Sequence, residues 1–375
     1  MSSLHDDEAA RNDVSSRVLG WDVLRGLSAL AVAVYHLLLW QDVATLHSFG
    51  SYGVYLFFVL SGASLAYTYA ERFEQGRFSM PRFLWVRYMR LAPLYVTLMV
   101  VVLPWKLLNE GMTGALLAKL SLNASFLFGF YNPVANSILV GGWSLGIEAV
   151  FYLLFPLLLA TVSRRLAIAT FGLLILVQAA WIARVFELPG AYAGNFVFYH
   201  QVPAFAAYFM GGCLLGLARR AGRVPRLPAP ALLAGVAGGF LVLLLLNPQP
   251  QGDELSGWRG AVLFTLCFVL VWFAGGLHLR QRNAQRLAAH LGDSTYGMYL
   301  MHPVVFFGLS FVVIPRLGLA PPQDWSLSAR LLLGFAIVVV TLALAILSER
   351  YFERPLREWS KARSKPYLDT ARISS

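Results

Sequence analysis

Long apolar runs separated by short polar segments form the main pattern of this chain. The runs are rich in Leu, Val, Ala and Phe and reach about 20 residues, the length of an α-helix that crosses a bilayer core. The alternating segments typical of membrane barrels do not occur. The pattern predicts an all-α polytopic membrane protein, a bundle of about ten transmembrane helices. The expected spans are 19–40, 52–70, 91–108, 145–162, 166–184, 199–217, 229–246, 258–277, 288–310 and 328–349.

Polar segments divide the chain into a tail over 1–18, a transmembrane domain over 19–350 and a second tail over 351–375. The first tail runs into an apolar segment of full spanning length, so no cleavable signal peptide is expected. The stretch 109–144 is apolar only in patches, and its pattern leaves a short or a re-entrant helix open.

Composition supports a surface that faces lipid. Charged residues make up 13% of the chain and the mean hydropathy is +0.63, whereas soluble domains carry about 25% charged residues. The two cysteines, Cys213 and Cys267, lie inside apolar runs, which excludes a disulfide framework and a cysteine metal cluster. No metal site is expected.

The distribution of basic residues predicts the orientation. With the N-terminus in the cytoplasm, most of the 30 Lys and Arg residues fall on cytoplasmic segments, as the positive-inside rule requires. Both termini are then cytoplasmic. This topology accounts for the net charge of +11, so nucleic acid is excluded as a partner.

Two ionisable side chains occur in the first span, where such groups are costly and usually functional. His36 follows Arg25 by eleven residues, which places both on one helix face about 16 Å apart. Arg25 is suited to hold a phosphate and His36 to act as a general base. Snorkelling of Arg25 to the interface and a hydrogen-bonded core role for His36 are the structural alternatives.

The next motifs have weaker signals. Ser61 precedes Gly62 in the second span, where small residues let helices pack closely; a site for a substrate carbonyl is the functional alternative. Arg87 and Arg90 are neighbours on one helix face and form a cytoplasmic anion site or ordinary positive-inside flanking.

The most specific local signal runs from Trp143 to Tyr152. Trp143 suits the outer interface, and Glu148 lies about a turn deeper in an otherwise apolar helix, at the expected depth of His36. Ser144 is a candidate for stabilising an oxyanion, and Tyr152 for contacting substrate. A structural ion pair is the alternative role of Glu148.

Near the end of the domain, His302 lies mid-span. It either lines a cavity together with the charged residues above or packs in the core. Glu353 and Arg354 are expected to anchor the last helix. Phosphate-loop, zinc-protease and nucleophile-elbow motifs are absent from the sequence.

These motifs occur in the order typical of one family, over nearly the whole chain. The segments that carry the resemblance are 22–26 with His36, 57–62, 87–90, 143–152, 299–303 and 353–355. Together they resemble the acyltransferase-3 family of bacterial membrane O-acyltransferases. Val23, Tyr55 and Ala149 depart from the family pattern at positions that we do not assign to catalysis.

The resemblance implies O-acylation, most often O-acetylation, of a hydroxyl on a cell-surface or exported glycan such as an exopolysaccharide. The donor is cytoplasmic acyl-CoA, expected to be acetyl-CoA, which acts as a co-substrate rather than a tightly bound cofactor. The implied location is the bacterial inner membrane. Some members carry a fused hydrolase-like domain, which we do not expect here because the chain ends soon after the last span.

The expected membrane depths of these residues and the chemistry of their side chains lead to one hypothesis. Arg25, Arg87 and Arg90 bind the CoA phosphates, while His36 deprotonates the acceptor or briefly carries the acyl group. Glu148 orients His36 or binds the sugar. Ser61, Trp143, Ser144, Tyr152 and His302 are the candidate substrate-binding residues.

A proton-coupled transporter or a flippase of a glycan or lipid-linked substrate is the rival. Buried Arg, His and Glu suit transport as well, but transporters often contain two matching halves, and this sequence has no internal repeat.

Overall fold

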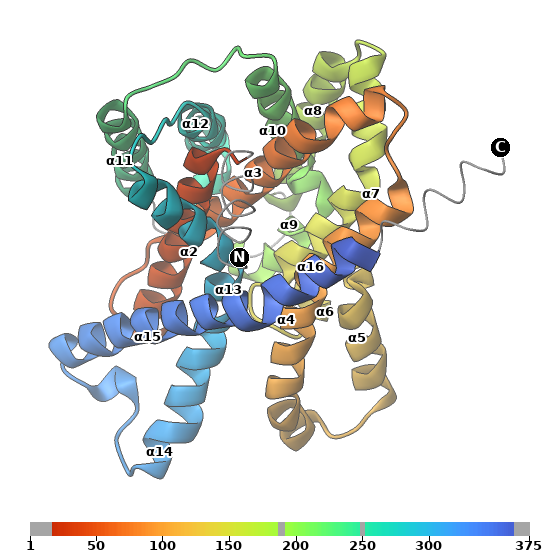
Figure 1. The fold of residues 1–375 in the computed structure, drawn as a ribbon. Coiled ribbons are helices and arrows are strands. Elements are labelled where there is room, and N and C mark those ends of the chain that lie inside the picture. The colour runs from red at the N-terminus through yellow and green to blue at the C-terminus, as the bar shows by residue number, and fades with distance from the viewer. Residues whose placement is uncertain (1–16, 187–191, 248–251, 364–375) are drawn as a thin grey trace, which may run out of the picture. The chain divides into compact units, whose positions relative to one another are not determined.

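The computed structural model describes residues 17–186, 192–247 and 252–363, and its elements are labelled in Figure 1. In these residues the regular structure is helical apart from one isolated parallel bridge between Leu227 and Leu277. The all-α prediction is therefore confirmed for the described chain.

The chain divides into two compact units, Met1–Tyr67 with Tyr208–Tyr296 and Thr68–Ala207 with Gly297–Ser375. Elements of the first unit, some shared with the second, are α2 (Leu19–Trp40), α3 (His47–Glu74), α10 (Ala206–Arg220), α11 (Ala229–Leu245), η3 (Asp253–Leu255), α12 (Gly257–Gly275) and α13 (Arg282–Gly308). The unit boundaries fall within α3, α10 and α13.

The second unit holds the remaining helices. In chain order these are α4 (Met80–Glu110), α5 (Gly114–Ser125), η1 (Leu127–Phe130), α6 (Pro133–Asn136), α7 (Trp143–Ser163), α8 (Ala167–Phe186), α9 (Tyr192–Tyr199), η2 (Val202–Ala204), η4 (Leu309–Val313), α14 (Ile314–Arg316), η5 (Pro322–Asp324), α15 (Leu327–Ser348), η6 (Glu349–Glu353) and α16 (Arg354–Arg363). Both η4 and η6 are single π-helical segments that continue the helix before them.

Eight helices of the described chain are long and apolar enough to cross a membrane, against about ten expected. The expected spans 199–217 and 229–246 correspond instead to α10 and α11, which have 15 and 17 residues. The span 199–217 was placed too early because the apolar residues before α10 belong to the end of α9 and to η2, whereas the span 229–246 agrees with α11 to within one residue. The chain is thus a polytopic membrane protein with eight candidate spans in its described part.

The stretch 109–144 forms short helices rather than one long one. Gly111, at φ +67°, ends α4, and the Thr113 side chain caps α5 by accepting from the Leu116 N–H at 3.1 Å. Asn123 then ties the stretch together. Its amide donates to the Asn136 carbonyl at 2.6 Å, and its oxygen accepts from the Ile138 N–H at 3.0 Å.

Close approach of α3 and α10 forms part of the first unit's core. A Cβ on Gly62 would lie 2.1 Å from the Phe209 carbonyl oxygen, and one on Gly212 would lie 2.1 Å from the Val59 oxygen. Any side chain at these positions would push the two backbones apart. The packing role that the sequence suggested for Gly62 is confirmed.

A second close contact positions the start of α7 in the other unit. A Cβ on Gly129 would lie 1.9 Å from the Gly146 carbonyl oxygen, so η1 packs directly on α7. This contact holds the α7 backbone between Trp143 and Glu148.

Candidate functional site

Arg25 is held in a polar cluster between α2 and α3. Its guanidinium donates to the Asp22 carboxylate at 2.7 Å, to the Leu60 carbonyl at 3.3 Å and to the Ser64 hydroxyl. The Arg25 side chain retains 15% of its exposure. Asp22 therefore balances the charge of Arg25, as a cation at membrane depth requires.

His36 lies at the other end of α2 among aromatic rings. Its imidazole stacks on Trp40 with ring centroids 4.7 Å apart and an interplanar angle of 15°, and it lies 4.9 Å from the Tyr35 ring. His36 is half-buried, whereas Tyr35 is buried. Stacking on Trp40 restricts the rotation of the imidazole and so presents it in a defined orientation.

Sequence reasoning missed a carboxylate at the same end of the first unit. Glu254 is 0% exposed, and its carboxylate accepts from the Ser51 hydroxyl at 3.2 Å and the Gly252 N–H at 2.8 Å. Tyr35, which lies within electrostatic range of Glu254, also approaches His47 at 3.5 Å. Glu254 lies outside the apolar runs, so hydropathy gave no signal of its burial.

Arg87 in the second unit is enclosed by an aromatic cage, which we define as Tyr69, Phe83 and Tyr152. The guanidinium carbon lies 5.4, 5.7 and 5.8 Å from the three ring centroids, within the range of cation–π attraction. One terminal nitrogen donates to the Tyr69 hydroxyl at 3.5 Å. The Arg87 Nε–H is buried without a hydrogen-bond partner among the described residues.

Tyr152 joins this cage to Glu148. Its hydroxyl donates to the Glu148 carboxylate at 2.7 Å, one turn along α7. Glu148 also lies within electrostatic range of Arg87. The structure thus brings Arg87, Glu148 and Tyr152, from two separate motifs, into one polar network.

Arg90 differs from Arg87 in its surroundings. It is exposed, although it remains within electrostatic range of Tyr152 and Glu353. The two arginines of the motif are therefore not equivalent, since only Arg87 is packed against aromatic rings.

Ser144 belongs to a hydroxyl cluster with Tyr299. Its hydroxyl lies 3.0 Å from the Tyr299 hydroxyl, and each lies 2.9 Å from the Gly141 carbonyl oxygen. Gly141 adopts φ +77°, a conformation that favours glycine. Because both hydroxyls share the Gly141 carbonyl as acceptor, this cluster connects the start of α7 to α13. Ser144 is also the candidate hydrogen-bond donor to an oxyanion.

Two buried histidines flank these residues. His302 is 1% exposed and its Nδ1 lies 3.1 Å from the Met298 carbonyl, which indicates a proton on Nδ1. His200, which sequence reasoning missed, is 2% exposed and its ring lies 4.3 Å from that of Trp143. The buried surroundings of His302 suit the core role that the sequence left open.

Ser61 is half-buried on α3 beside Gly62. The first unit therefore contains Arg25, His36 and Ser61, and the second contains the other predicted site residues. The predicted pairing of His36 with Glu148 joins residues of the two units and stays a prediction. In the described ranges, no three His, Cys, Asp or Glu side chains form a group that could hold a metal ion.

A family model described as "Acyltransferase domain" matches residues 18–350 of the chain. No solved structure is significantly similar to it.

Similar curated proteins are O-acetyltransferases by name. The chain is 25% identical to the peptidoglycan O-acetyltransferase OatA of Listeria monocytogenes and 28% identical to the putative peptidoglycan O-acetyltransferase YrhL of Bacillus subtilis. It is 23% identical to the O-acetyltransferase OatA of Staphylococcus aureus. Each match covers 90% of this chain and 55%, 54% and 57% of the three relatives, so the chain spans about half of their length.

Proposed function

The chain belongs to the acyltransferase domain family, and from this membership we propose that it transfers an acyl group from acyl-CoA to a hydroxyl of a cell-surface or exported glycan. The family match over residues 18–350 is the observation that carries the proposal. The names of the relatives favour acetyl as the acyl group and a cell-wall glycan as the acceptor.

The proposed location is the bacterial cytoplasmic membrane, with both termini in the cytoplasm. Eight candidate spans and the one-sided distribution of Lys and Arg support it. This orientation lets a cytoplasmic donor and an exported acceptor meet at one membrane protein.

In the proposed reaction, the imidazole of His36 takes the proton of the acceptor hydroxyl. The hydroxyl oxygen then forms a bond to the thioester carbonyl carbon, the carbon–sulfur bond breaks, and the CoA sulfur leaves with the proton. Transient transfer of the acyl group to His36 is the alternative route. The stacked position on Trp40 supports either route because it limits the orientations of the imidazole.

Glu148 and Tyr152 form the proposed polar wall of the reaction site. Their 2.7 Å hydrogen bond fixes the carboxylate for contact with the imidazole or with the sugar. Ser144 and Ser61 are proposed donors to the developing oxyanion, and Trp143 is proposed to contact the acceptor.

Arg25, Arg87 and Arg90 are proposed to serve the donor. Arg90 is exposed and able to meet a phosphate directly. The buried Arg87 Nε–H has no partner among the described residues and can donate a hydrogen bond to a ligand. Arg25 is bonded to Asp22, so it would add a phosphate contact to an existing ion pair.

The direct test is a turnover assay with purified full-length protein in lipid nanodiscs. Radiolabelled acetyl-CoA and cell-wall glycan are added, and both CoA release and label on the glycan are measured. We expect both to rise together. Vesicle uptake of the glycan without CoA release would contradict the proposal and favour the transporter.

A further inference from the structure

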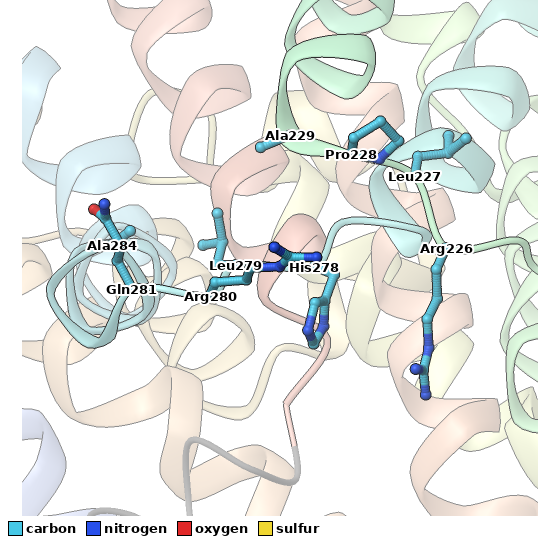
Figure 2. Close-up of a pocket in the computed structure, with 9 residues that line it drawn as sticks. All are labelled: Arg226, Leu227, Pro228, Ala229, His278, Leu279, Arg280, Gln281 and Ala284. Carbon is cyan, nitrogen blue, oxygen red and sulfur yellow. The ribbon is translucent and has the colours of Figure 1, made fainter.

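A basic cleft lies in the first unit, apart from every residue assigned above. It has a volume of about 770 Å³ and is shown in Figure 2. The residues that carry its chemistry are Arg226, Leu227, Pro228, His278, Arg280 and Gln281. A volume of this size falls in the range of about 300–1,000 Å³ typical of small-molecule sites.

Two loops that pair with each other form the cleft. The N–H of Leu227 donates to the Gly276 carbonyl at 3.0 Å, and a Cβ on Gly276 would lie 2.4 Å from the Pro225 oxygen. The first loop leads into α11 at Ala229, and the second leads from the end of α12 into α13 at Arg282. The pairing therefore holds the basic side chains on a defined backbone.

The charge of the cleft is positive and uncompensated. No carboxylate lines it, and within the described chain no hydrogen bond or ion pair engages the side chains of Arg226, His278 or Arg280. The first turns of α11 and α13, which border the cleft, also contain no acidic residue. In Figure 2 the side chains of Arg226 and His278 extend in the same direction from the two loops.

These guanidinium groups differ from those of Arg25 and Arg87. Arg25 is bonded to Asp22, and Arg87 is packed against three aromatic rings. Arg226 and Arg280 are exposed, so they can each form a bidentate contact with a phosphate without giving up another bond.

We propose that this cleft binds phosphate groups of a nucleotide, namely the adenosine 3′-phosphate end of the acyl-CoA donor; the inference rests on the proposed function. CoA carries a 3′-phosphate and a pyrophosphate, so several cations are needed to neutralise it. Leu227, Pro228 and Leu279 supply an apolar wall for the adenine ring, and the amide of Gln281 supplies hydrogen bonds. The phosphate of an anionic lipid headgroup has the same chemistry but does not need the apolar wall.

The test measures binding of CoA, dephospho-CoA and adenosine 3′,5′-bisphosphate to full-length protein in phosphatidylcholine nanodiscs. The variant combines Arg226→Ala with Arg280→Ala. The matched control combines Arg223→Ala in the first loop with Arg286→Ala in the first turns of α13, which removes equal charge at exposed positions that do not line the cleft. Arg280→Gln alone serves as a milder variant, and size-exclusion and thermal-melting profiles verify folding.

We expect the cleft variant to bind CoA and the bisphosphate about tenfold more weakly or worse, since charge-assisted contacts are lost. The control should bind as the native chain does. Native protein should prefer CoA to dephospho-CoA, and the cleft variant should lose that preference.

Two results would overturn the cleft proposal. The first is that both cleft variants bind CoA as tightly as the unsubstituted protein does, under conditions in which the unsubstituted protein turns over acetyl-CoA. The other is loss of retained phosphatidylglycerol, seen by native mass spectrometry, with CoA binding unchanged, which would assign the cleft to a lipid. Failure of the native chain to bind CoA or release it from acetyl-CoA would instead reject the proposed function.

Discussion

The hydroxyl of Tyr152 donates a 2.7 Å hydrogen bond to the carboxylate of Glu148, one turn earlier on α7. The ring of the same tyrosine faces the guanidinium of Arg87 at 5.8 Å. A single side chain thus connects the acidic and the basic motif through its two ends. Removing only the hydroxyl separates the two roles.

Tyr152→Phe should therefore lower kcat for acyl transfer by about tenfold, because Glu148 loses the group that orients it. The KM for acetyl-CoA should stay near the native value, since the ring over Arg87 remains. Steady-state kinetics measure both constants. Tyr88→Phe, which removes an exposed hydroxyl bonded to the Ala124 carbonyl, is the control. An unchanged kcat in Tyr152→Phe would remove the hydrogen bond from the mechanism.

His36→Ala should reduce acyl transfer by about 100-fold or more, the contribution typical of a general base. Binding of acetyl-CoA should persist, because the imidazole acts on the acceptor. The assay compares CoA release with donor affinity in the same preparation. His290→Ala, at an exposed position, should behave as the native chain. Normal turnover by a folded His36→Ala protein would reject the proposed role.

Arg87→Lys should raise the KM for acetyl-CoA by about tenfold, since a compact ammonium cannot cover three rings and also bond to Tyr69. Arg90→Lys should be nearly neutral because Arg90 is exposed and acts through its charge. Donor titration of the two variants side by side tests the difference. Equal effects would show that the aromatic cage contributes nothing specific.

Glu254→Gln should lower the free energy of unfolding by about 1–3 kcal/mol, the cost of leaving a buried donor without an acceptor. Its carboxylate serves both the Ser51 hydroxyl and the Gly252 N–H, and one amide oxygen cannot replace both carboxylate oxygens. Thermal melting in nanodiscs measures the loss. The control Asp253→Asn, at the exposed neighbouring residue, should have the same melting temperature as the native protein. An unchanged melting temperature for Glu254→Gln would contradict the prediction.

Asn123→Leu should destabilise the second unit by about 2 kcal/mol or more, because it strands buried polar groups. The Tyr95 hydroxyl and the Ile138 N–H both lose their acceptor, which lies at 2.6 and 3.0 Å. Hydrogen exchange over 114–142 should increase. The control Asn109→Leu loses only an exposed bond to the Trp105 carbonyl. Unchanged exchange in Asn123→Leu would show that the stretch is held by other contacts.

Much of the fold follows directly from hydropathy. A helix that crosses lipid needs about 20 apolar residues, and eight expected spans match helices of the structure. The shorter α10 shows the limit of that signal. Apolar residues of α9 and η2 continue the run into α10, so hydropathy alone places the start of that span too early.

Only part of the candidate site could be predicted from the sequence. Glu148 stood out because charges are rare in apolar runs, and Arg87 because it lies beside Arg90 on one helix face. Glu254 and the basic cleft did not, since charged residues in polar loops are common and their burial or convergence has no local pattern.

By itself the sequence determined that the chain enters a membrane repeatedly and which charged groups enter with it, because the bilayer imposes length and polarity on each helix separately. Tertiary structure decided the partners: Tyr152 for Glu148, Asp22 for Arg25, and the pairing of two loops around Arg226 and His278. Such contacts depend on distances between helices, and no spacing along one helix encodes them.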